Sequence, residues 1–186
     1  MDRKTIGIIV GSLRRESYCR KVALRLSELL ADAFDTTLLT GGDLPLYNQD
    51  SDDDGTPPPQ WTAFRDKVAA FDGVLFVTPE YNRSVPAVLK NALDVASRPP
   101  ARNAWSGKPG GIVSVSPGRL GAFGANNHLR QSAACLNIAV MPTPEGYFGG
   151  ASDFLGESGA VTDEHTAASL KRYAAAYAAW VKRFTD

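Results

Sequence analysis

The chain has 186 residues, of which 44% are hydrophobic and 22% charged, and its formal net charge at pH 7 is +0. This length and composition suit one soluble globular domain spanning residues 1–186. A neutral chain has no electrostatic footprint for nucleic acid or an anionic membrane surface, and no apolar run approaches the roughly 20 residues that span a bilayer. We therefore expect neither nucleic acid nor a membrane as a partner.

The start of the chain and its two cysteines indicate a compartment. The first four residues, Met-Asp-Arg-Lys, lead into a strand rather than into the apolar core of a signal peptide. Cys19 and Cys135 are too few for a disulfide framework in a chain of this size, and we expect both to be free thiols. The sequence therefore predicts a cytoplasmic protein.

Short apolar runs alternate with helical patterns along the chain. Strands are predicted at residues 5–10, 36–39, 73–77, 111–115 and 137–140. After the first strand, apolar residues recur at helical spacing from Val22 to Ala33, which predicts a helix from about Ser17. The strands are continuously apolar, as in a parallel sheet covered on both faces. The predicted fold is an α/β doubly wound sandwich, a five-stranded parallel sheet with helices on both faces.

Two long connections and the last helix complete the predicted elements. Residues 43–60 are rich in Asp, Pro and Gly and predict a surface excursion before a helix that starts near Trp61. Residues 148–162 predict another loop, which leads into the final helix. That helix carries an aromatic stripe at helical spacing, which indicates either core or subunit contact. The stripe consists of Tyr173, Tyr177, Trp180 and Phe184.

The first strand is followed by Gly-Ser-Leu-Arg-Arg-Glu-Ser-Tyr-Cys-Arg, residues 11–20. In doubly wound sheets, ligands bind beyond the carboxyl ends of the strands. Free N–H groups at a helix N-terminus attract anions, and Ser12, Arg14 and Ser17 add donors suited to phosphate oxygens. Alternatively, Ser17 only caps the helix and the arginines are solvated. Because the glycine patterns of dinucleotide sites and P-loops are absent from the sequence, we predict a monophosphate site.

Two further strand ends carry candidate ligand-binding residues. Residues 79–86, Pro-Glu-Tyr-Asn-Arg-Ser-Val-Pro, follow the third strand, and their prolines stiffen the loop. Tyr81 can flank a planar ring and Asn82 offers both donor and acceptor. Alternatively, Glu80 and Asn82 cap the following helix. Residues 116–121, Ser-Pro-Gly-Arg-Leu-Gly, follow the fourth strand. Either these small residues let a flat ligand come close to the backbone, or they form an ordinary glycine-rich turn.

These loops, with other segments in the same order, resemble the NAD(P)H-dependent FMN reductase family, in particular its quinone and chromate reductase-like branch. The matching segments are GSLR (11–14) with Ser17, LPLYNQD (44–50), PEYN (79–82), LKNALD (89–94), SRP (97–99), SPG (116–118) and HLRQS (128–132). The resemblance covers nearly the whole chain and implies a flavodoxin-like fold.

The resemblance also implies where FMN lies. The implied positions are Ser12, Arg14, Ser17 and the backbone of Tyr18 and Cys19 at the phosphate, Pro79, Glu80, Tyr81 and Asn82 along the isoalloxazine ring, and Ser116 and Gly118 on its other side. Cys19 stands where the family usually has Asn, which replaces a side-chain donor by a poorer one and predicts weaker FMN binding. The family usually has Gly where this chain has Ala87, and Trp where it has Val95. These two differences affect the expected shape of the surface that faces the substrate.

The implied activity is a ping-pong cycle. A hydride passes from NADPH or NADH to flavin N5, and two electrons then pass to quinones, free flavins, azo or nitro compounds, or metal oxyanions. Because the flavin carries the chemistry, no catalytic acid, base or nucleophile is predicted. The resemblance implies a homodimer or homotetramer, with the last helix and residues 43–60 as contacts.

Two other classes of function stay open, and metal sites are not predicted. One class is a flavodoxin-like electron carrier, although such carriers tend to be acidic and this chain is neutral; the other is a flavin-free binding module. His128 and His165 have no Cys or His neighbour at a ligand spacing. Residues 50–55 match the opening of a calcium loop, but Trp61 stands where the bidentate Glu is required.

Overall fold

The computed structural model describes residues 3–156 and 158–185. Met1 and Asp2, which belong to the predicted lead into the first strand, lie outside these residues. The strands are β1 (Thr5–Val10), β2 (Asp35–Leu39), β3 (Gly73–Thr78), β4 (Pro109–Val115), β5 (Ala139–Val140) and β6 (Gly146–Phe148). The helices are α1 (Tyr18–Leu30), α2 (Gln49–Asp53), α3 (Pro59–Ala69), α4 (Ala87–Ala96), α5 (Phe123–Cys135), α6 (Ala151–Phe154) and α7 (Glu164–Thr185), with a 3₁₀ turn η1 at Pro100–Arg102.

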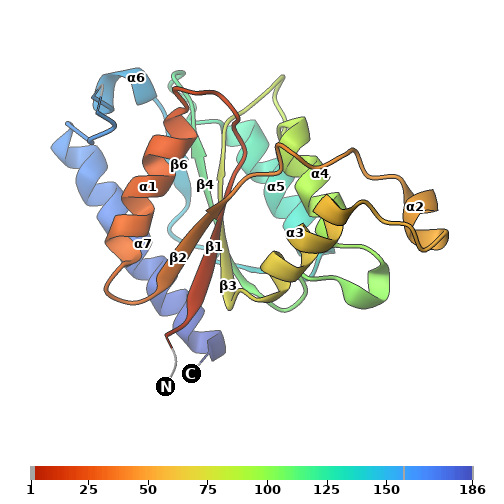
Figure 1. Ribbon diagram of the computed structural model, residues 1–186. Coiled ribbons are helices and arrows are strands. Elements are labelled where there is room, and N and C mark those ends of the chain that lie inside the picture. The colour runs from red at the N-terminus through yellow and green to blue at the C-terminus, as the bar shows by residue number, and fades with distance from the viewer. Residues whose placement is uncertain (1–2, 157, 186) are drawn as a thin grey trace.

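The strands form one parallel sheet in the order β2-β1-β3-β4-β5, with β6 also paired to β4. This order is the flavodoxin-like one, in which the chain winds outward in both directions from the first strand. Helices α1 and α7 lie on one face of the sheet, and α3, α4 and α5 lie on the other (Figure 1). The predicted fold class, a flavodoxin-like sandwich with helices on both faces, is confirmed.

The edge of the sheet beside β4 departs from the prediction of five strands. Of the predicted strand at residues 137–140 only β5 pairs, because Asn137 has a left-handed φ of 60°. The chain then returns to the same edge as β6, opposite the last residues of β4. Pro142 and Pro144 separate the two pieces and have no N–H to donate to a neighbouring strand. The sheet therefore has six strands, two of which share one edge position.

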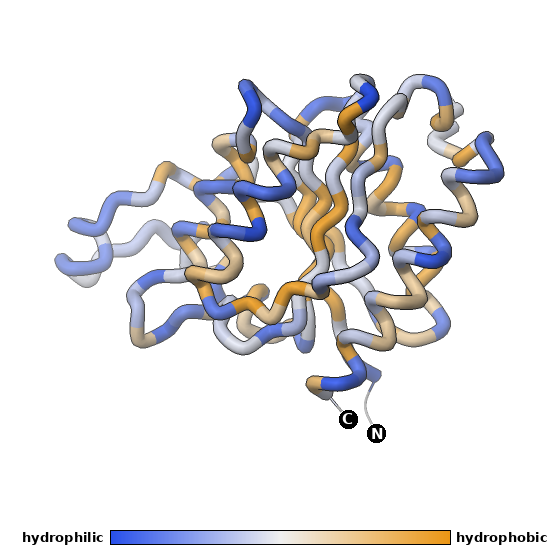
Figure 2. Tube along the Cα trace, turned by 180° about the vertical axis from the view of Figure 1, so that it is seen from behind, coloured by the Kyte–Doolittle hydropathy of each residue, from blue (hydrophilic) through white to orange (hydrophobic). Residues whose placement is uncertain are grey.

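Side chains of the central strands alternate between two hydrophobic cores. Ile6, Ile8 and Val10 of β1 pack with α1 and α7, whereas Ile9 packs with Phe76 of β3 against α3, α4 and α5. Because both faces are buried, the strands read as continuous apolar runs in the sequence. Figure 2 shows this concentration of hydrophobic residues along the middle of the sheet.

The first and last helices follow their predicted periodicity. Ser17 is the N-cap of α1, and the buried face of this helix includes Val22, Leu26 and Leu30. In α7 only part of the aromatic stripe has the predicted core role, and the subunit contact stays a prediction. Tyr173 and Tyr177 are buried in the core, while Phe184 is 47% exposed. None of the described helices is both long and apolar enough to cross a membrane.

The excursion at residues 43–60 contains the short helix α2, which the sequence did not predict, and helix α3 begins at Pro59. Polar side chains fasten this segment to its neighbours. Asn91 Oδ1 accepts the N–H of Tyr47 at 2.9 Å. Asn91 Nδ2 and Trp61 Nε1 both donate to the carbonyl of Pro45, at 3.0 and 2.9 Å. The excursion is therefore an ordered segment that packs on α3 and α4.

Candidate functional site

The loops after β1, β3 and β4 meet at the carboxyl end of the sheet, around a small cavity of about 100 Å³. The cavity is lined by Ser12, Arg14, Ser17, Tyr18, Cys19, Pro79, Glu80, Tyr81, Val115, Ser116 and Pro117. Every residue predicted to bind FMN lies in this lining except Asn82 and Gly118. Val115 and Pro117 were not predicted, although both flank Ser116 in the sequence.

The first loop is built on the N-terminus of α1. Ser17 is 2% exposed, and its Oγ accepts the N–H of Arg20 at 3.1 Å, so its role as N-cap is confirmed. This bond uses Oγ as an acceptor and leaves its hydrogen to donate. Ser12 is also buried, and the N–H groups of Tyr18 and Cys19 belong to the first helical turn, where no intrahelical acceptor exists. Capping and anion binding are therefore compatible at this loop.

Cys19 is buried and Arg14 is exposed, and both line the cavity. Burial raises the pKa of the Cys19 thiol to about 12, against a smaller opposing effect of the Arg14 charge. The thiol is therefore neutral throughout the physiological range. A neutral buried thiol is a poor hydrogen-bond donor and a poor nucleophile.

The loop after β3 forms a tight hairpin. The backbone N–H and C=O of Tyr81 pair with those of Ser84, each at 3.0 Å. Asn82 and Arg83 at the tip have φ angles of 50° and 65°, the left-handed pair of a type I′ turn. Asn tolerates this conformation well, whereas Arg83 is strained in it. The hairpin leaves Asn82 outside the cavity lining and keeps Tyr81, which is 49% exposed, within it.

The carboxylate of Glu80 is turned towards α5. Its Oε2 accepts the N–H of Ala125 at 3.1 Å, in the first turn of that helix, and its Oε1 lies 3.4 Å from Nη1 of Arg83. The alternative in which Glu80 and Asn82 cap the following helix is wrong, because α4 begins after Pro86 without a side-chain cap. The N-terminal dipole of α5 and the guanidinium offset the carboxylate charge.

The loop after β4 is supported by the segment that joins β6 to α6. Ser116 Oγ donates to the carbonyl of Gly118 at 2.9 Å, and that carbonyl also accepts the N–H of Gly150 at 3.3 Å. Gly149 allows this approach, since a Cβ there would collide with the carbonyl of Arg119. This support was not predicted from the sequence, although the adjacent glycines at 149 and 150 are a signal for it.

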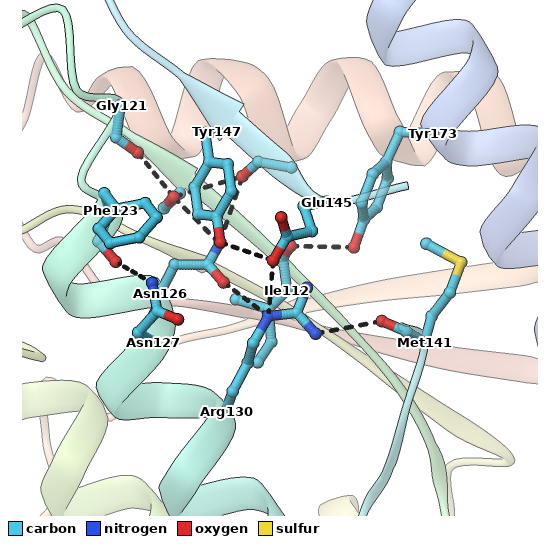
Figure 3. A network of polar contacts seen from close by, with 12 residues as sticks. Ile112, Gly121, Phe123, Asn126, Asn127, Arg130, Met141, Glu145, Tyr147 and Tyr173 are labelled. Atoms are coloured by element: carbon cyan, nitrogen blue, oxygen red, sulfur yellow. Dashed lines mark hydrogen bonds and ion pairs between the residues drawn. The ribbon is translucent and has the colours of Figure 1, made fainter. Parts of the chain in front are cut away.

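A buried polar network lies behind the same loop and joins β4 to α5 (Figure 3). Asn126 Nδ2 donates to Ser114 Oγ at 3.1 Å, and Ser114 Oγ donates to the carbonyl of Gly121 at 2.6 Å. Arg130 Nε donates to Asn126 Oδ1 at 3.1 Å. The network therefore fixes the end of the third loop at Gly121.

The donors around the cavity fit a phosphate monoester. Two serine hydroxyls, one guanidinium and the free N–H groups of a helix N-terminus are the groups that bind phosphate oxygens in proteins. The volume of about 100 Å³ is large enough for a phosphate group. Fold and site together define a flavodoxin-like α/β protein with a cavity lined by hydrogen-bond donors at the carboxyl end of its sheet.

Comparisons with known proteins agree with this class. Residues 5–153 match the model of the NADPH-dependent FMN reductase family. A quinone reductase of Pseudomonas putida is 51% identical over 178 residues, covering 96% of this chain and 95% of the relative. A 2-hydroxy-1,4-benzoquinone reductase of a Burkholderia species is 44% identical over 177 residues, covering 95% and 96%.

A solved structure is similar along the same length. The flavoenzyme NAD(P)H:(acceptor) oxidoreductase FerB of Paracoccus denitrificans has a TM-score of 0.90 and 37% identity, covering 97% of this chain and 98% of its own. The chain belongs to the NADPH-dependent FMN reductase family, as its motifs predict. It is an oxidoreductase with FMN as cofactor and a nicotinamide as electron donor.

Proposed function

We propose that this protein reduces quinones with NADPH or NADH, using FMN held at the carboxyl end of the sheet. The donor-lined cavity at the N-terminus of α1 carries this proposal, because it offers the donors that the FMN phosphate needs. The names of two similar proteins, quinone reductase and 2-hydroxy-1,4-benzoquinone reductase, support a quinone as acceptor. Bound FMN supplies the redox chemistry, which is transfer of two electrons from the nicotinamide to the quinone.

The phosphate is assigned to the loop after β1. Ser12, Arg14 and Ser17 donate from their side chains, and Tyr18 and Cys19 donate from their backbone N–H groups. The burial of both serines supports this role, because a charge-assisted hydrogen bond is stronger where water is excluded.

The flavin ring is assigned to the other two loops. Pro79, Glu80 and Tyr81 run along one side of it, and Ser116 lies on the other. Asn82 and Gly118, which lie outside the cavity lining, remain predictions. No catalytic acid, base or nucleophile is assigned among the lining residues, since the Cys19 thiol is neutral and the Glu80 carboxylate is bonded to α5.

Stopped-flow absorbance tests the reductase proposal. The purified protein, loaded with FMN, is mixed anaerobically with NADPH or NADH, and loss of the flavin absorbance is expected with at least one of them. Addition of a benzoquinone should then restore the absorbance. If neither nicotinamide reduces the flavin, the proposal is overturned in favour of an electron carrier. If the protein binds no FMN, the proposal is overturned in favour of a flavin-free binding module.

Steady-state rates identify the preferred electron acceptor and the preferred nicotinamide. We expect the highest kcat/KM with quinones in a panel that includes free flavins, azo and nitro compounds and metal oxyanions. Each acceptor is measured with NADPH and with NADH at equal concentration. A quinone rate below that of every other acceptor class would contradict the proposed substrate.

We also propose a single domain, a homodimer or homotetramer, and a cytoplasmic location. Two hydrophobic cores on the faces of one sheet support one domain.

Leu46 on the excursion is 78% exposed although its neighbours are anchored, which supports a subunit contact there. The two free thiols, Cys19 and Cys135, support a reducing compartment. Light scattering after size exclusion, for the wild type and Leu46→Ser, tests the assembly; a monomeric wild type would contradict it.

A further inference from the structure

Helix α5 contacts the loop after β3 at two points. Glu80 Oε2 accepts the N–H of Ala125 at 3.1 Å, and one helical turn further on Nδ1 of His128 lies 3.0 Å from Ser84 Oγ. These contacts flank the left-handed tip of the hairpin, Asn82 and Arg83. A strained turn persists only where its surroundings hold it, and here the two anchors on α5 hold it.

Glycine at position 124 brings this loop close to the helix. A Cβ on Gly124 would lie 2.8 Å from the carbonyl oxygen of Arg83 and 2.9 Å from Glu80 Oε2. Real Cβ atoms do not approach backbone oxygens so closely, so any side chain there would push the hairpin away. The contact between α5 and the hairpin is therefore close-packed as well as hydrogen-bonded.

The same helix also holds the loop after β4. Asn126, the residue next to Ala125, is fully buried and reaches the carbonyl of Gly121 through Ser114 (Figure 3). Adjacent residues of one helix turn thus fasten both loops between which the flavin ring is assigned. The residues that reach these loops from α5 do not line the cavity.

We propose that α5 is the shared anchor of the two flavin-facing loops, with Glu80, Ser114 and Asn126 as positioning residues. This inference rests on the proposed FMN site. Glu80 acts through its carboxylate on α5 and not by a side-chain contact with the flavin. Loss of the anchor lets the Tyr81 hairpin move, which weakens FMN binding and misplaces the ring relative to the nicotinamide and the quinone.

The first test compares Glu80→Ala with Glu80→Gln. The alanine variant loses the acceptor for the Ala125 N–H, and we expect an FMN Kd about tenfold higher, the scale of one charge-assisted hydrogen bond. Glutamine keeps an oxygen acceptor, so it should recover most of the affinity. With saturating FMN, Glu80→Ala should still show a lower kcat, because the hairpin is displaced.

Asn127→Ala is the matched control. This residue lies next to Asn126 and is exposed; it donates to the carbonyl of Phe123 in its own helix at 2.9 Å and also bonds to the Tyr147 hydroxyl, and neither partner lines the cavity. The control should bind FMN and turn over like the wild type. A purely structural role of Glu80 would lower Tm in Glu80→Ala but leave Kd and kcat unchanged, and that result would overturn the proposal.

Gly124→Ala and Ser114→Ala give independent perturbations if Glu80→Ala does not fold. The first pushes the hairpin from the helix, and the second cuts the link from Asn126 to Gly121. We expect each to raise the FMN Kd by about fivefold to tenfold. If both bind FMN like the wild type, the shared anchor is refuted. A wild type that binds no FMN refutes the proposed function instead.

Discussion

The hydroxyl of Tyr177 is buried and has no hydrogen-bond partner within the described part of the chain. Burial raises the pKa of this phenol well above its ordinary value, so the group is neutral but still desolvated. Tyr173, one helical turn earlier, donates its hydroxyl to the carbonyl of Ile112 at 3.0 Å. The two tyrosines are therefore a natural matched pair, one with a satisfied hydroxyl and one without.

We expect Tyr177→Phe to stabilise the protein by about 1 kcal/mol, because it removes an unpaired buried polar atom. Tyr173→Phe should destabilise it by a similar amount, since the Ile112 carbonyl loses its donor. Urea denaturation of both variants measures the free energies of unfolding. Destabilisation by Tyr177→Phe would mean that the hydroxyl is satisfied in solution.

Cys19 is the residue at which the phosphate loop departs from the family motif. We expect Cys19→Asn to lower the FMN Kd severalfold, because an amide donates hydrogen bonds better than a neutral thiol. The apoprotein should lose stability, since the position is 2% exposed and a polar group replaces an apolar one. Fluorescence titration gives the Kd, and an unchanged or higher value would contradict the expectation.

At the scale of elements, an ion pair adds to the hydrogen bonds that fasten the excursion carrying α2. Arg65 Nη2 lies 2.7 Å from Asp52 Oδ2, and the two side chains are only 14% and 8% exposed. Arg65 also donates from Nε to the carbonyl of Val95 at 2.9 Å, which links α2 to α4. The hydrogen bond from Arg65 is the main reason that the pKa of Asp52 is lowered.

The pKa of Asp52 is lower in the folded state than in the unfolded state. Its ionised form therefore adds to the free energy of unfolding above the unfolded-state pKa of about 4, and this stabilisation is lost as the pH falls through the folded-state pKa. Asp52→Asn should therefore cost about 3 kcal/mol at pH 7 and progressively less below pH 4. Asp53→Asn, exposed on the same short helix, is the control and should cost little. A pH-independent difference between Asp52→Asn and the wild type would contradict this account.

The elements that could be predicted from the sequence have both a pattern and an end signal. Helix α1 has an apolar face and the Ser17 cap, and β1, β3 and β4 are buried on both sides. Helix α2 has five polar residues and no buried one, so no periodicity marks it. Strand β6 has three residues and forms only through pairing with β4, which no local pattern records.

At the scale of the whole molecule, the position of the site could be predicted because parallel strands deliver their loops to one end of the sheet. The direction in which individual side chains point could not be predicted from the sequence. Glu80 faces a helix that begins more than forty residues later, and the hairpin turns Asn82 out of the lining. Both depend on tertiary contacts between distant segments.

FMN should stabilise the folded protein as a whole. At a free concentration 100 times its Kd, we expect about 2.7 kcal/mol in the free energy of unfolding, seen as a higher Tm in calorimetry. Riboflavin, which lacks the phosphate, should give a much smaller rise at the same concentration. Equal shifts with both ligands would show that the loop after β1 does not bind the phosphate.

The divided edge formed by β5 and β6 bears on how copies of this chain meet. An unbroken outer strand offers a row of N–H and C=O groups to any other strand and invites aggregation. Here Pro142 and Pro144 interrupt that row, and neither flanking strand exceeds three residues. This edge is therefore a poor template for a continuous intermolecular sheet. Any assembly of copies through this side of the molecule must therefore use helix faces or loops rather than strand pairing.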